Sequence, residues 1–214
     1  MIPIIADIVS SRELDDRRTA QRAIESAFAQ VVDILPAHAR PVRPFTAVVG
    51  DEFQGAFPTL RAALAATLLV RLALPAGLDL RFGLGLGEVE EIPSTSGSLS
   101  EGPGWWAARA AIEHVEEIAR REAPQARTWV AAAAEQAEGA ADLVRIANAA
   151  ALARDRVVGR WSDRVRALVC GRIAGVTQGD LAQSQGISQS AVSQTLAAAG
   201  ATTIILAYGQ LVEL

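Results

Sequence analysis

Strand-like and helix-like patterns alternate along the first 132 residues of the chain, and strand signals then nearly disappear. Read from periodicity, the order is strand, helix, two strands, helix, strand, helix, strand. This order is typical of a split βαβ, ferredoxin-like (βαββαβ) sheet with one added helix-strand unit. The sequence therefore predicts an α+β fold, with a ferredoxin-like domain at 1–140 followed by an all-α domain at 141–214.

Proline, glycine and polar clusters set the bounds of the predicted elements. The strands 45–49 and 53–57 are expected to form a hairpin with Gly50 and Asp51 at its tip. The Ser/Gly/Pro-rich segment 92–104 is predicted to be a mobile loop. The other predicted strands are 1–9, 78–89 and 127–131, and the predicted helices are 16–35, 58–74 and 105–122. Residues 201–214 are strongly apolar and are read either as a dimerising helix or as a packed strand.

The predicted strand 78–89 carries Gly83, Gly85 and Gly87 on one face. Glycines at alternate positions of a strand indicate that another backbone, or a ligand, approaches closely. The sequence leaves both possibilities open.

Composition limits the classes of function. The net charge of −4 gives no general attraction to nucleic acid or to an anionic membrane. All 20 basic residues are arginine, so a lysine base or P-loop lysine is excluded. The single cysteine, Cys170, is expected to be a buried thiol. The longest apolar stretch is interrupted by Arg71, Pro75 and Asp79, which favours a buried helix over a membrane span. A cytoplasmic protein is expected.

Two carboxylates lie where predicted strands end. Asp7 closes the first strand, and Asp51 is at the hairpin tip. In a ferredoxin-like sheet the first strand lies beside the hairpin, so the two carboxylates can converge. Together with the main-chain carbonyl of Ile8 they suit Mg²⁺, which takes few protein ligands. Aspartate is also a common turn residue, so the pattern alone does not decide between a metal site and ordinary turns.

Four segments, in order, resemble class III nucleotidyl cyclases. Ala6-Asp7-Ile8 resembles their first metal motif, and Gly50-Asp51 resembles the hairpin of the second. Continued to Phe53, the latter also spells all but the first glycine of the GGDEF signature of diguanylate cyclases. The segment 80–89 resembles the cyclase strand Leu-Arg-Ile-Gly-Ile-His-Thr-Gly-x-Val, and Ala107-Ala108-Arg109 resembles the end of the Asn-x-Ala-Ala-Arg helix. The resemblance covers roughly residues 1–130.

The resemblance implies a metal site and its chemistry. It makes Asp7 and Asp51 the catalytic ligands of Mg²⁺ or Mn²⁺, with the Ile8 carbonyl as a third ligand. Glu52 is the corresponding metal acid of GGDEF proteins, although in the cyclase register it points to the other face of its strand. Arg109 is the expected transition-state residue, and in a cyclase-type homodimer it would face Asp7 and Asp51 of the partner chain.

The same resemblance implies a nucleoside triphosphate or a cyclic nucleotide as ligand. Ile8, Val9 and Ser10 are the predicted contacts after the first strand. Trp105 stands where the family has its catalytic Asn, and its ring could stack on a base. The base-reading Lys falls on Ala47, and no clear match exists for the purine-reading Asp. Adenylyl or guanylyl specificity is therefore not implied.

The C-terminal part carries the spacing of a helix-turn-helix. Thr177 and Ser188 are placed to cap two short helices. Ala182, Gly186 and Val192 match the Ala, Gly and Ile/Val positions of bacterial helix-turn-helix units. The alternative is an ordinary helical hairpin with a solvated polar face. For double-stranded DNA, the predicted contacts on the second helix are Ser188, Gln189, Ser190, Ser193 and Gln194.

Taken together, these segments resemble the SatD family of bacterial proteins, with matches at 6–12, 50–55 and 160–196. Three functions remain open. The first is a DNA-binding regulator, most simply a homodimer, whose cyclase-like domain senses a nucleotide with Mg²⁺. The second is an active nucleotidyl cyclase or a related metal-dependent phosphotransfer enzyme. The third is a scaffold whose acids are vestigial.

Overall fold

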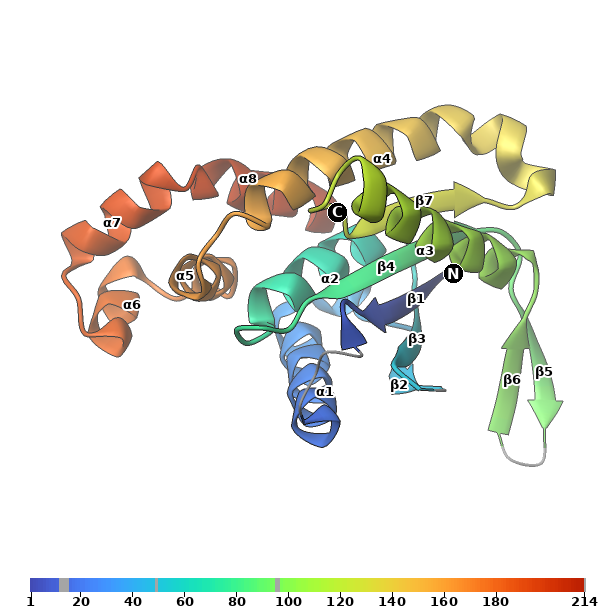
Figure 1. Cartoon of the computed structure of the whole chain (residues 1–214), viewed down its shortest axis with the longest axis horizontal. Helices are drawn as coiled ribbons and strands as arrows, with labels where there is room; N and C mark the ends of the chain where they lie inside the picture. Colours follow the sequence, from blue (N-terminus) through green and yellow to red (C-terminus); the bar gives the residue numbers. More distant parts are fainter. Residues whose placement is uncertain (12–15, 49, 95–96, 214) are drawn as a thin grey trace.

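The computed structural model describes residues 1–11, 16–48, 50–94 and 97–213. Among these residues a mixed sheet has the strand order β2-β3-β1-β4-β7 (Figure 1). Neighbouring strands are antiparallel, except that β4 and β7 are parallel. The predicted α+β class is confirmed. The strands are β1 Ile2–Ile8, β2 Arg43–Ala47, β3 Glu52–Phe57, β4 Leu80–Leu86 and β7 Thr128–Ala132.

Helices cover the two faces of this sheet. On one face, α1 (Arg17–Ile34) and α2 (Leu60–Ala73) bury a large apolar core that includes Ile4, Phe53 and Phe82. On the other face, α3 (Pro103–Arg121) buries a smaller core around Ile5. The remaining helices are α4 Ala137–Val158, α5 Asp163–Ile173, α6 Gln178–Gln185, α7 Gln189–Ala198 and α8 Ala201–Val212. The 3-10 helices η2 Ala37–Ala39 and η3 Ala134–Gln136 also lie between elements.

The large core continues from the sheet into the C-terminal helices, where Leu168, Val192 and Ile204 belong to the same apolar cluster. The predicted division at residue 140 falls within α4, and it stays a prediction. Residues 201–212 form a helix, α8, and not a strand. In the part of the chain that the structure describes, no single helix has the length and hydropathy of a membrane span. The pair α7 and α8 meets that test together but is bent by 78°.

Side-chain caps begin several helices. Asp16, Thr59 and Ser162 each accept a hydrogen bond from a main-chain N–H in the first turn of α1, α2 and α5. Thr177 and Ser188 do the same for α6 and α7, as the sequence predicts. Such a cap contributes about 1 kcal/mol by satisfying an N–H that has no partner within the helix.

The prediction of a mobile loop at 92–104 is wrong. The structure contains a two-stranded antiparallel hairpin there, β5 (Glu90–Ser94) and β6 (Gly97–Glu101), followed directly by α3 (Figure 1). Pro93 is compatible with a strand because both strands are edges, where the lost N–H need not pair. The predicted strand end at Val49, and Arg12 of the family match, lie outside the described residues.

The glycines of β4 allow a close approach of another backbone, that of α3. A Cβ on Gly83 would lie 2.3 Å from the carbonyl oxygen of Ala108, and one on Gly85 would lie 1.9 Å from that of Gly104. Of the two possibilities left by the sequence, the approaching group at these positions is therefore a helix. This packing fixes α3 over β4, and with it the position of Arg109.

The carboxylate of Asp155 joins α4 to the sheet. Its side chain is fully buried and accepts from Nη1 of Arg71 at 3.0 Å. It also accepts from the main-chain N–H groups of Arg127 and Thr128 at 2.8 and 2.9 Å, and from Nε and Nη2 of Arg154. A buried carboxylate with this many donors is satisfied, so the two arginines are held in place.

Replacing Asp155 by Ala should destabilise the fold strongly. It leaves Arg71 and two main-chain N–H groups without this buried acceptor, and breaking a buried ion pair costs about 3–5 kcal/mol. Urea unfolding followed by circular dichroism measures the change. Asp142→Ala is the matched control, because Asp142 is on the same helix with its side chain 90% exposed. A similar loss in both variants would contradict this role of Asp155.

Candidate functional site

Three charged residues meet on the α3 side of the sheet. Asp7 of β1 lies opposite Glu52 of β3 and opposite Arg81 of β4. Residues directly opposite one another in neighbouring strands project to the same face. Glu52 therefore shares a face with Asp7, which differs from the cyclase-register expectation that it points to the other face.

Arg81 binds Asp7 in a bidentate ion pair. Its Nε donates to Oδ1 at 2.9 Å, and its Nη2 donates to Oδ2 at 3.0 Å. The third nitrogen, Nη1, lies 3.4 Å from a carboxylate oxygen of Glu116 on α3. A planar guanidinium matches a carboxylate in this way, which fixes the orientation of Asp7.

Arg109 of α3 makes a second pair with Glu52. Nη2 donates to Oε1 and Nη1 lies near Oε2, both at 2.7 Å. The hydrogen bond from Arg109 to Glu52 raises the pKa of this guanidinium. The side chain of Arg109 is 45% exposed, so it can still reach a ligand from solvent. Gln54 also donates to Glu52, at 3.1 Å.

Asp51 lies in the turn before β3, and Gly50 adopts a left-handed conformation there with φ of 67°. The predicted hairpin tip is confirmed. Burial raises the pKa of Asp7 above its ordinary value of 3.8, and the hydrogen bond from Arg81 opposes this shift. The negative charges of Glu116 and Asp51 raise the pKa of Asp7 further.

The arrangement does not fit a preformed Mg²⁺ or Mn²⁺ site. Asp7 and Glu52 each direct their carboxylate onto an arginine. Within the described ranges, no group of three or more His, Cys, Asp and Glu residues is placed to hold a metal ion. A hard cation needs free carboxylate oxygens, so no step of the chemistry is assigned to a metal.

A cavity of about 420 Å³ opens next to this cluster, between the β2–β3 hairpin and the start of α3. Trp105, Thr46 and Gln54 are among its lining residues. The indole N–H of Trp105 donates to the Ser100 hydroxyl at 3.0 Å, which holds the ring in place. Gln54 links this cavity to the charged cluster through Glu52. An aromatic face with polar groups around it can hold a planar ring.

The residues predicted just after the first strand do not join this cavity. Ile8 is buried in the large core. Val9 and Ser10 line another cavity, of about 350 Å³, together with Arg71 and Arg166. Only Asp7 of the first predicted motif therefore shares the face with Trp105 and Arg109.

Helices α6 and α7 pack against each other, with Gly186 in a left-handed conformation between them. Ala182 and Val192, at the predicted spacing, are buried. Ile187 donates its main-chain N–H to Ala182, which closes the turn. The five residues predicted to contact DNA are all exposed: Ser188, Gln189, Ser190, Ser193 and Gln194.

Arg81 and Glu116 are site residues that the sequence reasoning missed. Arg81 was visible in the cyclase-like segment 80–89 but received no role, because its partner Asp7 is 74 positions away. Glu116 gave no signal beyond a charged helix, since only the packing of α3 on β4 brings it to Arg81.

Solved structures of similar arrangement are nucleotidyl cyclases. One bacterial light-regulated adenylyl cyclase matches with a TM-score of 0.41 and 18% identity, over 60% of this chain and 42% of that chain. A second structure described in the same words gives 0.41 and 16%, over 60% and 73%. The guanylyl cyclase Cya2 gives 0.39 and 16%, over 53% and 68%. This chain thus spans less than half of the first structure.

The sequence itself places the chain in a family. The SatD family model matches residues 1–208, so the chain belongs to the SatD family. No curated protein matches the sequence.

Asp7→Asn should gain stability relative to wild type as the pH rises. Because the pKa of Asp7 is raised in the folded state, ionisation favours the unfolded state. The resulting penalty is absent below the ordinary pKa of 3.8 and grows as the pH rises through the folded-state pKa. Thermal unfolding of both proteins from pH 3 to pH 7 should show the Asp7→Asn variant gaining stability over wild type as the pH rises.

Asp33→Asn, which removes an exposed acid on α1, controls for the loss of surface charge. A pH-independent difference between wild type and Asp7→Asn would contradict the raised pKa.

Proposed function

We propose that this SatD-family chain is a DNA-binding regulator that responds to a nucleotide. The observation that carries the proposal is the hydrogen-bonded link between the Trp105 cavity and Arg109: Gln54, which lines the cavity, donates to Glu52, and Glu52 accepts from Arg109. A guanidinium group can bind two oxygens of one phosphate at once. The face of an indole ring can stack on a base. A nucleoside triphosphate or a cyclic nucleotide offers both groups at once. The strand order β2-β3-β1-β4 and the connection order βαββαβ support a ferredoxin-like assignment for this part of the chain.

In this proposal the nucleotide phosphates compete with carboxylates for the arginines. Arg109 binds Glu52 and Arg81 binds Asp7 before the ligand arrives. Arg109 is the more exposed of the two and is the first contact. Because Arg109 already pairs within its own chain, the proposed site does not require Arg109 of a partner.

A second candidate function, turnover by a nucleotidyl cyclase, rests on one observation. Asp51 directly precedes Glu52, the residue opposite Asp7 in the sheet, so two acids of the metal motifs are close in space. Turnover by this route would need Mg²⁺ or Mn²⁺. The nucleotide experiment below is therefore run both with and without Mg²⁺ or Mn²⁺.

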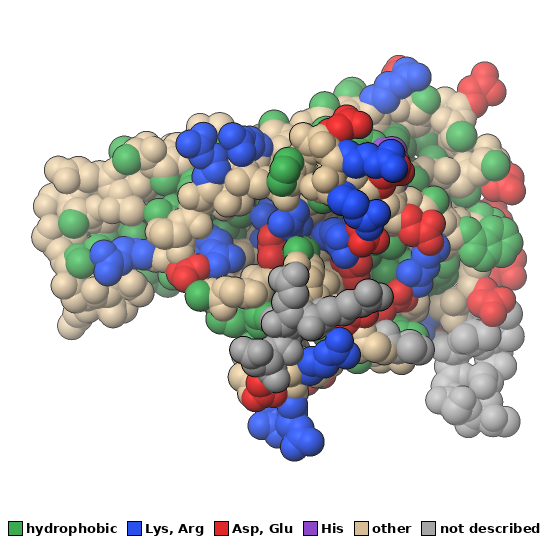
Figure 2. All heavy atoms as spheres, in the orientation of Figure 1, with side chains coloured by type: hydrophobic (Ala, Val, Ile, Leu, Met, Phe, Trp, Pro, Cys, Tyr) green, Lys and Arg blue, Asp and Glu red, His purple; other side chains and the backbone are tan. Residues whose placement is uncertain are grey.

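The proposed output is DNA contact by α7. Its exposed Gln189 and Gln194 can pair with adenine in the major groove. In Figure 2 charged side chains mix over the middle of the molecule, whereas the end formed by α6 and α7 is mostly uncharged. With few charges at that end, phosphate contacts contribute little, so two copies on two half-sites are needed for useful affinity.

Nucleotide binding should raise the melting temperature through Arg109. A nucleotide at 100 times its dissociation constant stabilises the fold by about 2.7 kcal/mol. The measurement is a thermal-shift screen of nucleoside triphosphates and cyclic nucleotides, each with EDTA, Mg²⁺ or Mn²⁺. The shift should be lost in Arg109→Ala and in Trp105→Ala.

Arg121→Ala is the matched control, an exposed arginine on the same helix with an (i, i+4) ion pair to Glu117. It should keep the full shift. A shift that appears only with metal and is lost in Asp51→Ala, with a new product, would favour turnover. No shift with any nucleotide would refute the proposal.

DNA selection should depend on the glutamines of α7. Wild-type protein is used to select duplexes from a randomised pool, and the Gln189→Ala/Gln194→Ala variant is run in parallel. The variant should lose enrichment of any motif, since each base contact is worth about 1–3 kcal/mol. Gln185→Ala, on α6, should select the same motif as wild type. Absence of enrichment by the wild type would argue against sequence-specific DNA binding.

A further inference from the structure

An apolar stripe runs along the outer face of α4. Leu143, Ile146 and Val157 are 52%, 69% and 36% exposed, and Ala150 and Ala153 between them are also exposed. The five positions are spaced three, four, three and four residues apart. This is the 3.5-residue repeat of a helix that packs along another helix. No helix among the described residues covers this stripe, because its members are exposed.

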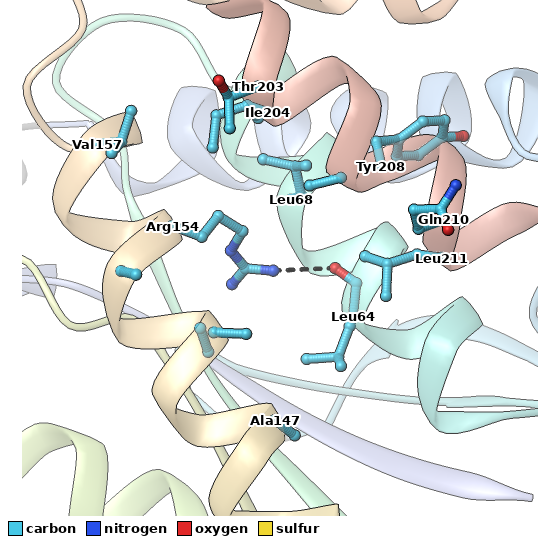
Figure 3. Close-up of a pocket in the computed structure, with 14 residues that line it drawn as sticks. Leu64, Leu68, Ala147, Arg154, Val157, Thr203, Ile204, Tyr208, Gln210 and Leu211 are labelled. Carbon is cyan, nitrogen blue, oxygen red and sulfur yellow. Dashed lines mark hydrogen bonds between the residues drawn. The ribbon is translucent and has the colours of Figure 1, made fainter. Parts of the chain in front are cut away.

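The stripe borders an apolar groove between α4, α2 and α8 (Figure 3). The groove has a volume of about 480 Å³, and Leu68, Ala150 and Ala207 are among its lining residues. Leu206, one helical turn before the lining residue Gln210 on α8, is 66% exposed. A contiguous apolar surface of this kind marks an interaction site.

The groove presents no charge to an occupant. Arg154 reaches into it, as Figure 3 shows, but each of its N–H groups has an acceptor within the chain. Its acceptors are the carbonyl of Leu64, the hydroxyls of Thr67 and Thr128, and the carboxylate of Asp155. The occupant is therefore apolar where it touches the groove.

The charges beside the stripe are arranged for an antiparallel partner. Glu138 and Asp142 lie near the N-terminal end of α4, and Arg156 and Arg160 lie at or just after its C-terminal end. Glu138 and Arg156 are 18 residues apart, which is five helical turns, so they lie on one side of the stripe, and Asp142 lies one turn after Glu138 on the same side. Arg160 follows two residues after the end of α4. A two-fold axis level with Ala150 would set the acids of each copy against the arginines of the other.

We propose that a second copy of this chain docks here, with the two α4 helices antiparallel and the small residues at Ala150 and Ala153 allowing close approach. One self-complementary patch on both subunits gives a closed two-fold dimer. The partner's Ile146 and Leu206 fill the apolar groove. This surface is separate from the Arg109 face, so the dimer does not depend on the proposed nucleotide site.

Sedimentation velocity of the full chain, without nucleotide or DNA, tests the dimer. Wild type should be a dimer, and Ile146→Asp should be a monomer at the same concentration. Trp106→Asp should remain a dimer. This is a matched control, because Trp106 is 70% exposed but lies on α3, at the other face. A monomeric wild type, or dissociation by Trp106→Asp but not by Ile146→Asp, would overturn the proposal.

Charge reversal tests the antiparallel arrangement. Glu138→Arg/Asp142→Arg and Arg156→Glu/Arg160→Glu should each weaken the dimer at least tenfold. Asp142 also pairs with Arg145 within its own chain, and Arg156 donates to Gln125, so each variant has some local cost. The fourfold variant restores opposite charges across the two-fold axis and should recover the wild-type dissociation constant. No recovery would overturn the antiparallel pairing.

An engineered disulfide between the two copies tests the position of the two-fold axis. Ala150→Cys should form a covalent dimer under mild oxidation, because position 150 meets itself across the axis. Ala149→Cys, exposed one residue away and turned to another side of the helix, should not. Cys170 does not interfere, since it is buried and its pKa is raised to about 11. Cross-linking of the Ala149→Cys variant but not of the Ala150→Cys variant would overturn the proposal. So would a monomer that binds N-phenyl-1-naphthylamine in the groove, which would indicate a small apolar ligand instead.

Discussion

The buried carboxylate of Asp155 fixes the relation between the sheet and everything that follows it. It accepts hydrogen bonds from Arg71 of α2 and from the main chain at the start of β7, and Arg154 beside it reaches back to the carbonyl of Leu64. Leaving this buried charge unpaired would cost several kcal/mol of folding free energy. The ion pairs of Asp155 therefore hold α4 in one position against the sheet. The groove beside α4 follows from that position, whereas α5 and α8 pack on α2.

The charged face of the sheet is governed by a competition between acids and arginines. Asp7 is partly buried, and burial raises its pKa despite the ion pair with Arg81. Asp51 and Glu116 add to the negative charge around it. Arginines pair with two of the acids on this face, Asp7 with Arg81 and Glu52 with Arg109. A ligand that carries phosphates can bind the arginines in place of these carboxylates. The carboxylates would then be free, as they would already be in a preformed metal site.

The sequence predicts well those features that depend on local pattern. The hairpin tip at Gly50, the caps Thr177 and Ser188, and the close approach at Gly83 all follow from residue type and spacing over a few positions. The β5–β6 hairpin was missed, because Ser- and Gly-rich edge strands lack an alternating pattern. The roles of Arg81 and Asp155 were also missed, since their partners are up to 84 residues away and only the packed sheet brings them together.

A contiguous set of contacts joins the charged face to the C-terminal helices. The main chain that leaves Asp7 is held by a hydrogen bond from the Val9 N–H to the carbonyl of Asp79, at 3.0 Å. The Asp79 carboxylate pairs with Arg71, which also bonds Asp155 on α4. Such contiguity does not by itself couple two sites. A nucleotide at the charged face changes the C-terminal helices only if it binds two arrangements of these contacts with different affinity. In a dimer through α4, that difference would act on both copies of α7, because a shift of α4 changes the distance between them.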